Sequence, residues 1–374
     1  MRTIIIAACL AVLTLWPCLS PADDGREVIR LGVVSSATGD ASISSKVLFL
    51  AARYAVKEIN QAGGLLGRKV VVWEYDNQSS ALGSKAAAES AVADGVAAVI
   101  GASWSSHSLA MAPVLQAARV PMITPVSTSP EVTRAGDYIF RCCYTDEVQG
   151  TVMARFAREH LGVSRAATLV NVSRVYSMGL ARRFEESFMA MGGRIVAQGV
   201  YTLDTANYDK MLKAVAETAP DVLYLPGDYR DSSFIIKQAR DLGISTPILG
   251  GDSFGIRLYD YIGRAAEGSY YTTHWHRDSP LPASTEFVAR WEDMYGYIRQ
   301  TTIPMTYDAV MLWADAVRRA GSTDGPLVRS ALAKADYRGV TGRITFDGNG
   351  DPFKTVVINR LQDGDVVYVR SVEP

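Results

Sequence analysis

The clearest structural signal in the chain lies in residues 29–75, which read IRLGVVSSATGDASISSKVLFLAARYAVKEINQAGGLLGRKVVVWEY. Residues 29–34 form a β-branched apolar run, which is typical of a buried strand. Residues 47–61 place apolar side chains at helical spacing, and Gly63 is suited to end that helix in a left-handed conformation. A second β-branched run follows at 70–75. The stretch therefore predicts a strand–helix–strand unit.

The same alternation continues through the following 200 or so residues. Continuous apolar strands between amphipathic helices imply parallel sheets that are covered by helices on both faces. Two runs of about 120 residues share this rhythm, so we expect an α/β fold with two similar lobes that can hinge. The further strands are expected at 96–100, 121–124, 166–172, 195–201, 222–226, 247–250 and 269–274, and the helices at 83–94, 106–118, 179–191, 208–218 and 232–242.

Composition and charge narrow the functional classes. The 374 residues are 48% hydrophobic and 21% charged, which is ordinary for a globular protein and allows two domains. Lys and Arg number 38 against 39 Asp and Glu, for a net charge of -1. This balance argues against a nucleic-acid partner, which would require a basic surface.

The first residues read as a targeting segment. Arg2 precedes an apolar run at 4–15, which is too short for a ~20-residue membrane span. Small residues at Ser20 and Ala22 predict a signal peptide of residues 1–22 and an exported, periplasmic protein. A lipoprotein anchor at Cys18 is the less favoured alternative, because bulky residues precede it. The adjacent Cys142 and Cys143 are expected to be buried, small core residues rather than a disulfide.

Polar side chains follow several of the expected strands, where open α/β sheets bind their ligands. Hydroxyl-rich segments occur at 101–106 and 125–128, each before a helix. Hydroxyls and the free N–H groups of a helix N-terminus suit a carboxylate. Asp228 and Asp252 follow later strands and suit an ammonium group. Together these segments indicate a zwitterion such as a free α-amino acid, although each alone is more typical of a helix cap or a turn.

The chain resembles the periplasmic solute-binding proteins of the leucine/isoleucine/valine-binding family. The resemblance covers nearly all of the chain after the targeting segment and rests on the order and spacing of several short motifs. These are AVKEINQAGGLLGR (55–68), VIG (99–101), PVSTSPEVT (125–133), FR (140–141), KQARDLG (237–243), GGD (250–252), YDA (307–309) and GVTGRITFD (339–347).

The resemblance implies a type I periplasmic binding fold with two Rossmann-like lobes. Lobe 1 is expected at 23–145 and 276–350, and lobe 2 at 146–275 and 351–374. The implied function is binding of a free amino acid, branched-chain or related, for an ABC importer by closure of the lobes. The implied partners are the ligand and the membrane permease subunits, and the chain is expected to be a monomer with no cofactor and no metal.

The resemblance also implies ligand contacts by position. Ser105 meets the α-carboxylate, Val126 contributes a backbone contact, and Thr128 meets both α-groups, with Ser127 between them. In the second lobe, Tyr176 closes over the ligand and Asp252 receives the α-ammonium.

Two positions depart from the family pattern. Asp228 stands where relatives often have Tyr. Ser44 stands where several relatives have a large apolar or aromatic residue in the wall of the binding site, and Trp104 can fill that space instead. A second acid and an extra aromatic favour a basic or cationic ligand through charge pairing or cation–π contact. Capping of the following helix by Asp228 is the alternative. Amide, urea or aromatic-acid ligands, and a sensing module for a signalling partner, also stay open.

Enzyme functions find little support. The sequence contains no G-x-S-x-G nucleophile elbow and no phosphate-binding loop, so we expect no catalytic activity. His274 and His276 lie on one face of an expected strand, as a metal pair would. No further ligands lie nearby, and the resemblance places this segment where the chain crosses between lobes, so a structural role is the preferred interpretation.

Overall fold

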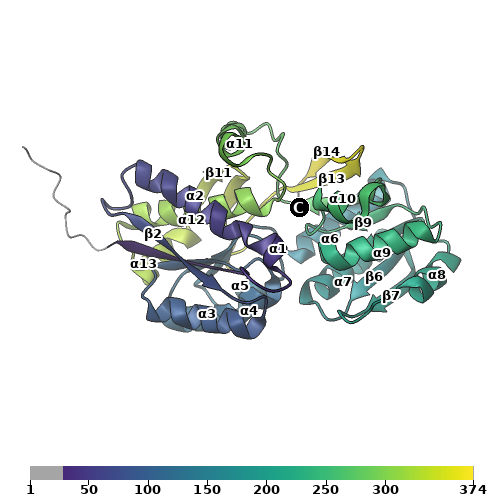
Figure 1. Cartoon of the computed structure of the whole chain (residues 1–374), viewed down its shortest axis with the longest axis horizontal. Helices are drawn as coiled ribbons and strands as arrows, with labels where there is room; N and C mark the ends of the chain where they lie inside the picture. The colour runs from purple at the N-terminus through teal and green to yellow at the C-terminus, as the bar shows by residue number, and fades with distance from the viewer. Residues whose placement is uncertain (1–27, 374) are drawn as a thin grey trace, which may run out of the picture.

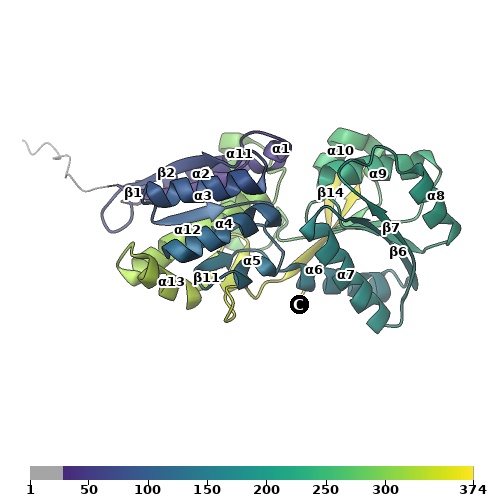
Figure 2. The same ribbon diagram turned by 90° about the horizontal axis from the view of Figure 1, so that it is seen from below.

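The computed structural model describes residues 28–373 of the chain. The expected signal peptide at 1–22, and Cys18 with it, lie outside the described residues. Figures 1 and 2 show two α/β bodies side by side, joined by several connecting segments. No helix in the described part of the chain is long and apolar enough to cross a bilayer.

The first α/β body is built on a five-stranded parallel sheet in the order β2-β1-β3-β4-β5. Its strands are β1 (Ile29–Ser35), β2 (Val70–Asp76), β3 (Ala98–Gly101), β4 (Met122–Thr124) and β5 (Ile139–Arg141). Its helices are α1 (Ser42–Ser45), α2 (Val47–Gln61), α3 (Ala81–Ala93), α4 (Ser105–Ala118), α5 (Glu131–Arg134), α11 (Pro282–Tyr295), α12 (Thr302–Ala320) and α13 (Gly325–Ala333), and a hairpin of β11 (Asp336–Gly339) and β12 (Gly342–Thr345) completes it.

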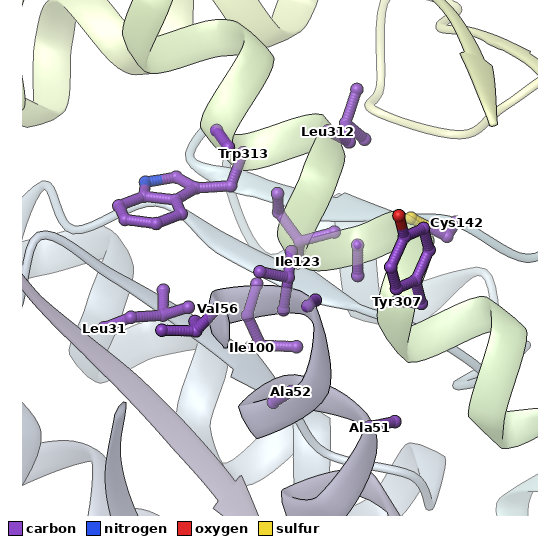
Figure 3. Packing of buried hydrophobic residues seen from close by; sticks show 14 of the residues in the cluster. Leu31, Ala51, Ala52, Val56, Ile100, Ile123, Cys142, Tyr307, Leu312 and Trp313 are labelled. Atoms are coloured by element: carbon purple, nitrogen blue, oxygen red, sulfur yellow. The ribbon is translucent and has the colours of Figure 1, made fainter. Parts of the chain in front are cut away.

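Alternation along these strands gives the first sheet two apolar faces. Ile100 of β3 belongs to one buried cluster with α2 and α12, whereas its neighbour Val99 belongs to another with α3 and α4. Figure 3 shows Ile100 and Ile123 between the side chains of α2 and α12. The sheet is therefore covered on both faces, and only its strand ends are free to carry polar groups.

The second α/β body is built on a seven-stranded sheet in the order β14-β13-β10-β9-β8-β6-β7. Its strands are β6 (Arg165–Asn171), β7 (Arg194–Tyr201), β8 (Val222–Leu225), β9 (Ile248–Gly250), β10 (Tyr270–Thr273), β13 (Val356–Gln362) and β14 (Asp365–Val372). Its helices are α6 (Asp146–Arg155), α7 (Val175–Ala190), α8 (Asp209–Glu217), α9 (Tyr229–Asp241) and α10 (Arg257–Ile262), with a π-helical turn η1 (Phe156–His160) after α6 and a 3₁₀ turn η2 (Gly263–Ala266) after α10.

The expected α/β architecture with helix-covered parallel sheets is confirmed, with two differences. The second sheet is mixed, because β13 pairs antiparallel with β10 and β14 antiparallel with β13. Helices α7 and α9 also begin at Val175 and Tyr229, a few residues before the expected starts at 179 and 232. Gly179, the first residue of this helix in the sequence prediction, lies inside α7. The earlier starts matter, because they place the residues just before each helix at the sheet edge.

Candidate functional site

A cavity of about 180 Å³ lies between the two bodies, at the carboxyl ends of their parallel strands. A buried water requires roughly 10–15 Å³ of such space, so the cavity holds about a dozen water-sized groups. That capacity fits a ligand of about ten heavy atoms, the size of a free amino acid. Seven of the expected binding residues line it, together with Ser44: Trp104, Ser105, Val126 and Thr128 from the first body, and Tyr176, Asp228 and Asp252 from the second.

Ser127 is the exception among the expected binding residues. It is fully buried outside the cavity lining, and its Oγ donates to the carbonyl of Ala102 at 3.0 Å and contacts Ser108 Oγ at 2.8 Å. Ser127 therefore fastens the β4 loop to the β3 loop, and it does not face a ligand. Cys143 packs beside it and donates its thiol to the Ser127 carbonyl at 3.3 Å. Cys142 and Cys143 are both buried and both free thiols, as expected.

The first body presents hydroxyl groups beside a helix N-terminus. Ser105 is the first residue of α4, and its Oγ accepts from the backbone N–H of Ser129 at 3.2 Å. Thr128 follows β4 and lies on the same wall of the cavity. The first N–H groups of α4 have no partner within the helix, so this wall favours a carboxylate.

A buried guanidinium fixes the loop that carries Val126 and Thr128. Arg141, at the end of β5, is 0% exposed and donates from Nη1 to the Ser127 carbonyl at 2.6 Å and from Nη2 to the Ser129 carbonyl at 2.8 Å. Its Nε donates to Asp351 at 2.6 Å, in the segment that leads to β13. Arg141 therefore acts as a positioning residue that the sequence motif contained but did not explain.

Asp252, after β9, is the centre of the second body's polar wall. Its Oδ1 accepts from Tyr176 Oη at 3.0 Å and from Gln149 Nε2 at 3.1 Å, and its Oδ2 lies 3.0 Å from His274 Nε2. Burial alone would raise the pKa of Asp252, but these hydrogen bonds hold it below its usual value. Burial also lowers the pKa of His274, so the imidazole is neutral at neutral pH and acts on Asp252 as a hydrogen-bond donor. The result is an ionised carboxylate whose side chain is only 10% exposed.

A second carboxyl group lies close behind this wall. Asp146, the first residue of α6, is buried, and its N–H donates to the Thr128 carbonyl at 2.9 Å. Burial, reinforced by the charge of Asp252, raises the pKa of Asp146 to about 8, against the opposing influence of Thr128 and Arg141. Asp146 is therefore protonated and neutral at neutral pH, whereas Asp252 is ionised.

Asp228 and Trp104 meet an arginine that the sequence reading missed. Arg174, just before α7, lies with Nε 3.2 Å from Asp228 Oδ2 and with its guanidinium 4.2 Å from the Trp104 ring centre. Asp228 occupies the N-cap position of α9 but makes no side-chain capping hydrogen bond. The capping alternative is therefore not seen in the structure, and Arg174 supplies a cation to both the acid and the aromatic that were expected to favour a cationic ligand. Burial and Asp231 raise the pKa of Asp228 to about 7, although Arg174 acts in the opposite direction.

The two histidines considered as a metal pair have separate partners. His274 contacts Asp252, whereas His276 Nε2 lies 3.4 Å from the Val366 carbonyl. Between residues 28 and 373, no group of three or more His, Cys, Asp or Glu side chains is arranged to hold a metal ion.

Comparison with known proteins gives one consistent result. Residues 28–365 match the model of a family described as periplasmic binding protein. The leucine-specific-binding protein of Salmonella typhimurium is 29% identical over 326 residues, which cover 86% of this chain and 88% of that protein.

Solved structures agree with the sequence relatives. The leucine binding protein LivK of Thermotoga maritima is 32% identical, with a TM-score of 0.88 over 93% of this chain and 99% of its own. LivJ of Streptococcus pneumoniae, solved in complex with isoleucine, is 27% identical, with a TM-score of 0.88 over 93% of this chain and 100% of its own. The match spans both bodies and the cavity between them. With its two α/β bodies and the ligand-sized cavity at their strand ends, this chain belongs to the periplasmic binding protein family.

Proposed function

We propose that the protein binds a free α-amino acid between its two bodies and delivers it to the membrane subunits of an ABC importer. The observation that carries the proposal is the pairing of two opposite walls across one cavity. Ser105 and Thr128, beside the start of α4, form the wall suited to an α-carboxylate. The ionised Asp252 forms the wall suited to an α-ammonium group.

Closure supplies the specificity in this proposal. The two bodies act as lobes, 23–145 with 276–350 and 146–275 with 351–374, that hinge at the segments between them. The carboxylate docks first on Ser105 and Thr128, and the second lobe then brings Tyr176 and Asp252 over the ligand. Exclusion of water strengthens the charge pairing, since the effective dielectric constant falls. The closed form is the one that the permease subunits recognise, and the protein works as an exported monomer without catalytic activity.

Relatives support an α-amino acid as the ligand class. Proteins named as binding leucine, or leucine, isoleucine and valine, align with most of the chain, and LivJ was solved with isoleucine. The family to which the chain belongs is extracytoplasmic by its description, which agrees with the proposed location.

A ligand screen by thermal shift tests the proposal. The purified protein is first unfolded and refolded to remove carried-over ligand, and each of the twenty amino acids is then added separately. A ligand at 100 times its Kd adds about 2.7 kcal/mol of stability, which raises the unfolding midpoint by several degrees. We expect a shift with at least one α-amino acid, and none with its decarboxylated amine or its deaminated acid. A shift with those analogues and with no amino acid would contradict the proposal.

A further inference from the structure

Side chains that line the cavity follow the order of the strands in each sheet. In the second sheet, β9, β8 and β6 are neighbours, and they lead to Asp252, Asp228 and Arg174 in turn. Neighbouring strands lie about 4.8 Å apart, so Asp252 and Arg174 follow strands separated by roughly 10 Å. In the first sheet, β4, β3 and β1 lead in the same way to Thr128, Trp104 and Ser44.

This order defines two positions along the cavity, one at the ends of β4 and β9 and a distal one at the ends of β3 and β6. Thr128 and Asp252, which the proposed function assigns to the α-groups, follow β4 and β9. The contact of Arg174 with Trp104 joins the ends of β6 and β3, one strand or two farther along each sheet. A ligand whose α-carbon lies at the first position therefore extends its side chain by roughly 5–10 Å toward the second.

The pair at the distal position has unused hydrogen-bonding capacity. Arg174 and Asp228 are each about one-fifth exposed, and both line the cavity. Arg174 Nε makes no hydrogen bond to a described residue, and its approach to Asp228 is a charge contact only. The Asp228 carboxylate accepts no capping hydrogen bond from the first N–H groups of α9. A guanidinium has five N–H donors and a carboxylate about four lone-pair sites, so each retains groups that a ligand can satisfy.

The other described arginines of the cavity wall already have partners of their own. Arg257 donates to the Ile43 carbonyl at 2.7 Å, Arg277 pairs with Glu292, and Arg299 pairs with Asp260. Arg174 and Asp228 are therefore the cation and the anion of the described cavity lining that face each other at the distal position, and their charges cancel when Asp228 is ionised.

We infer that the Arg174–Asp228 pair beside Trp104 receives the distal end of the ligand's side chain and selects a neutral polar group, such as a carboxamide. The carbonyl of a carboxamide accepts from Arg174, and its NH₂ donates to Asp228. A purely aliphatic end satisfies neither group and leaves both desolvated, which costs about tenfold or more in affinity. A charged end is attracted by one member of the pair and repelled by the other. This inference rests on the proposed function, since it assumes that the α-groups bind at Thr128 and Asp252.

The test uses isothermal titration calorimetry at pH 8, where Asp228 is mostly ionised, with amino acids that share the same α-groups. Glutamine and glutamate differ in charge at nearly equal shape, asparagine and leucine differ in polarity at similar shape, and lysine carries the opposite charge. We expect glutamine or asparagine to bind the parent protein at least tenfold more tightly than glutamate, leucine or lysine.

Two single variants should change selectivity in opposite directions. Arg174→Gln leaves Asp228 uncompensated, so the ratio of lysine to glutamine affinity should rise at least tenfold. Asp228→Asn leaves Arg174 uncompensated, so the ratio of glutamate to glutamine affinity should rise by a similar factor. The double variant should show neither shift. Arg343→Gln and Asp336→Asn serve as controls. They break an exposed ion pair, with Arg343 Nε 2.6 Å from Asp336 Oδ1, whose residues do not line the cavity, and they should leave every ratio unchanged.

The outcomes separate this inference from the proposed function. If leucine binds the parent more tightly than glutamine and asparagine, or if neither single variant changes its selectivity, the distal assignment is overturned while amino-acid binding stands. If no amino acid produces heat or a thermal shift, the proposed function fails and the inference fails with it. Circular dichroism of each variant identifies any loss of fold. If one single variant is unstable, the other single variant is compared with the double variant, which keeps the site neutral and should show no change in selectivity.

Discussion

Replacing Asp252 by Asn tests the centre of the proposed site, because it removes the charge and keeps the shape. The Asp252 side chain is only 10% exposed and accepts from Tyr176, Gln149 and His274. Two unit charges 4 Å apart attract by about 4 kcal/mol at an effective dielectric constant of 20. An amide recovers part of this through a neutral hydrogen bond of about 1 kcal/mol. We therefore expect a loss of roughly 2–5 kcal/mol in binding, or about 30-fold to several thousand-fold in Kd.

The same substitution perturbs the protein itself, and the two effects need separate measurements. One amide oxygen cannot accept all three hydrogen bonds, so we expect a loss of about 1–3 kcal/mol in unfolding free energy. Affinity is measured by calorimetry at least 15 °C below the variant's midpoint, with the amino acid that shifts the parent most. Asp336→Asn, on an exposed carboxylate, is the matched control. An affinity within twofold of the parent in a folded Asp252→Asn protein would refute the assignment of the ammonium site.

Three other predictions follow from buried or bridging groups. Because the pKa of Asp146 is raised to about 8, the folded protein keeps a proton that the unfolded chain loses near its ordinary value of 3.8, and stability falls as pH rises between these values. The unfolding free energy of Asp146→Asn, relative to that of the parent, should therefore rise by a few kcal/mol from pH 5 to pH 9 in urea titrations. A difference in unfolding free energy that does not change with pH would contradict the assignment. Arg141→Met leaves Asp351 without its guanidinium partner and removes the hydrogen bonds to Ser127, Ser129 and Thr133, so it should cost about 3–5 kcal/mol of unfolding free energy, and a cost under 1 kcal/mol would disprove its role. Arg257→Ala removes the bond to the Ile43 carbonyl that joins the two bodies, so small-angle scattering should report a larger radius of gyration without ligand, and an unchanged profile would count against the bridge.

The strand–helix rhythm made most of the fold predictable. Helix α2 matches the expected 47–61 at both ends, since its apolar stripe and Gly63, which has a φ of 97°, mark it locally. The antiparallel strands β13 and β14 were not predicted as part of the second sheet, because β14 pairs only with β13, and β13 joins the sheet through β10, which lies about 90 residues earlier in the chain. Local periodicity carries no information about which sheet a strand joins.

The proposed binding residues divide along the same line. The resemblance to the leucine/isoleucine/valine-binding family indicated Ser105, Val126, Thr128, Tyr176 and Asp252 by position, and all five line the cavity. Ser127 was named with them, but alternation along the loop turns its side chain toward Ala102 and Ser108. The chain order could not distinguish a hydroxyl that faces a ligand from one that fastens a loop.

By itself, the sequence determined the two α/β halves and the polar character of their strand ends, because periodicity and residue type are local properties. Only the tertiary structure decided the electrostatics of the cavity. Arg174 is 70 residues from Trp104 and 54 from Asp228, yet folding brings the three together. Whether an acid attracts a ligand or a neighbouring arginine depends on distances of a few ångströms, since charge interactions fall with separation and rise with burial. Those distances are set by how the two sheets pack and not by the order of residues along the chain.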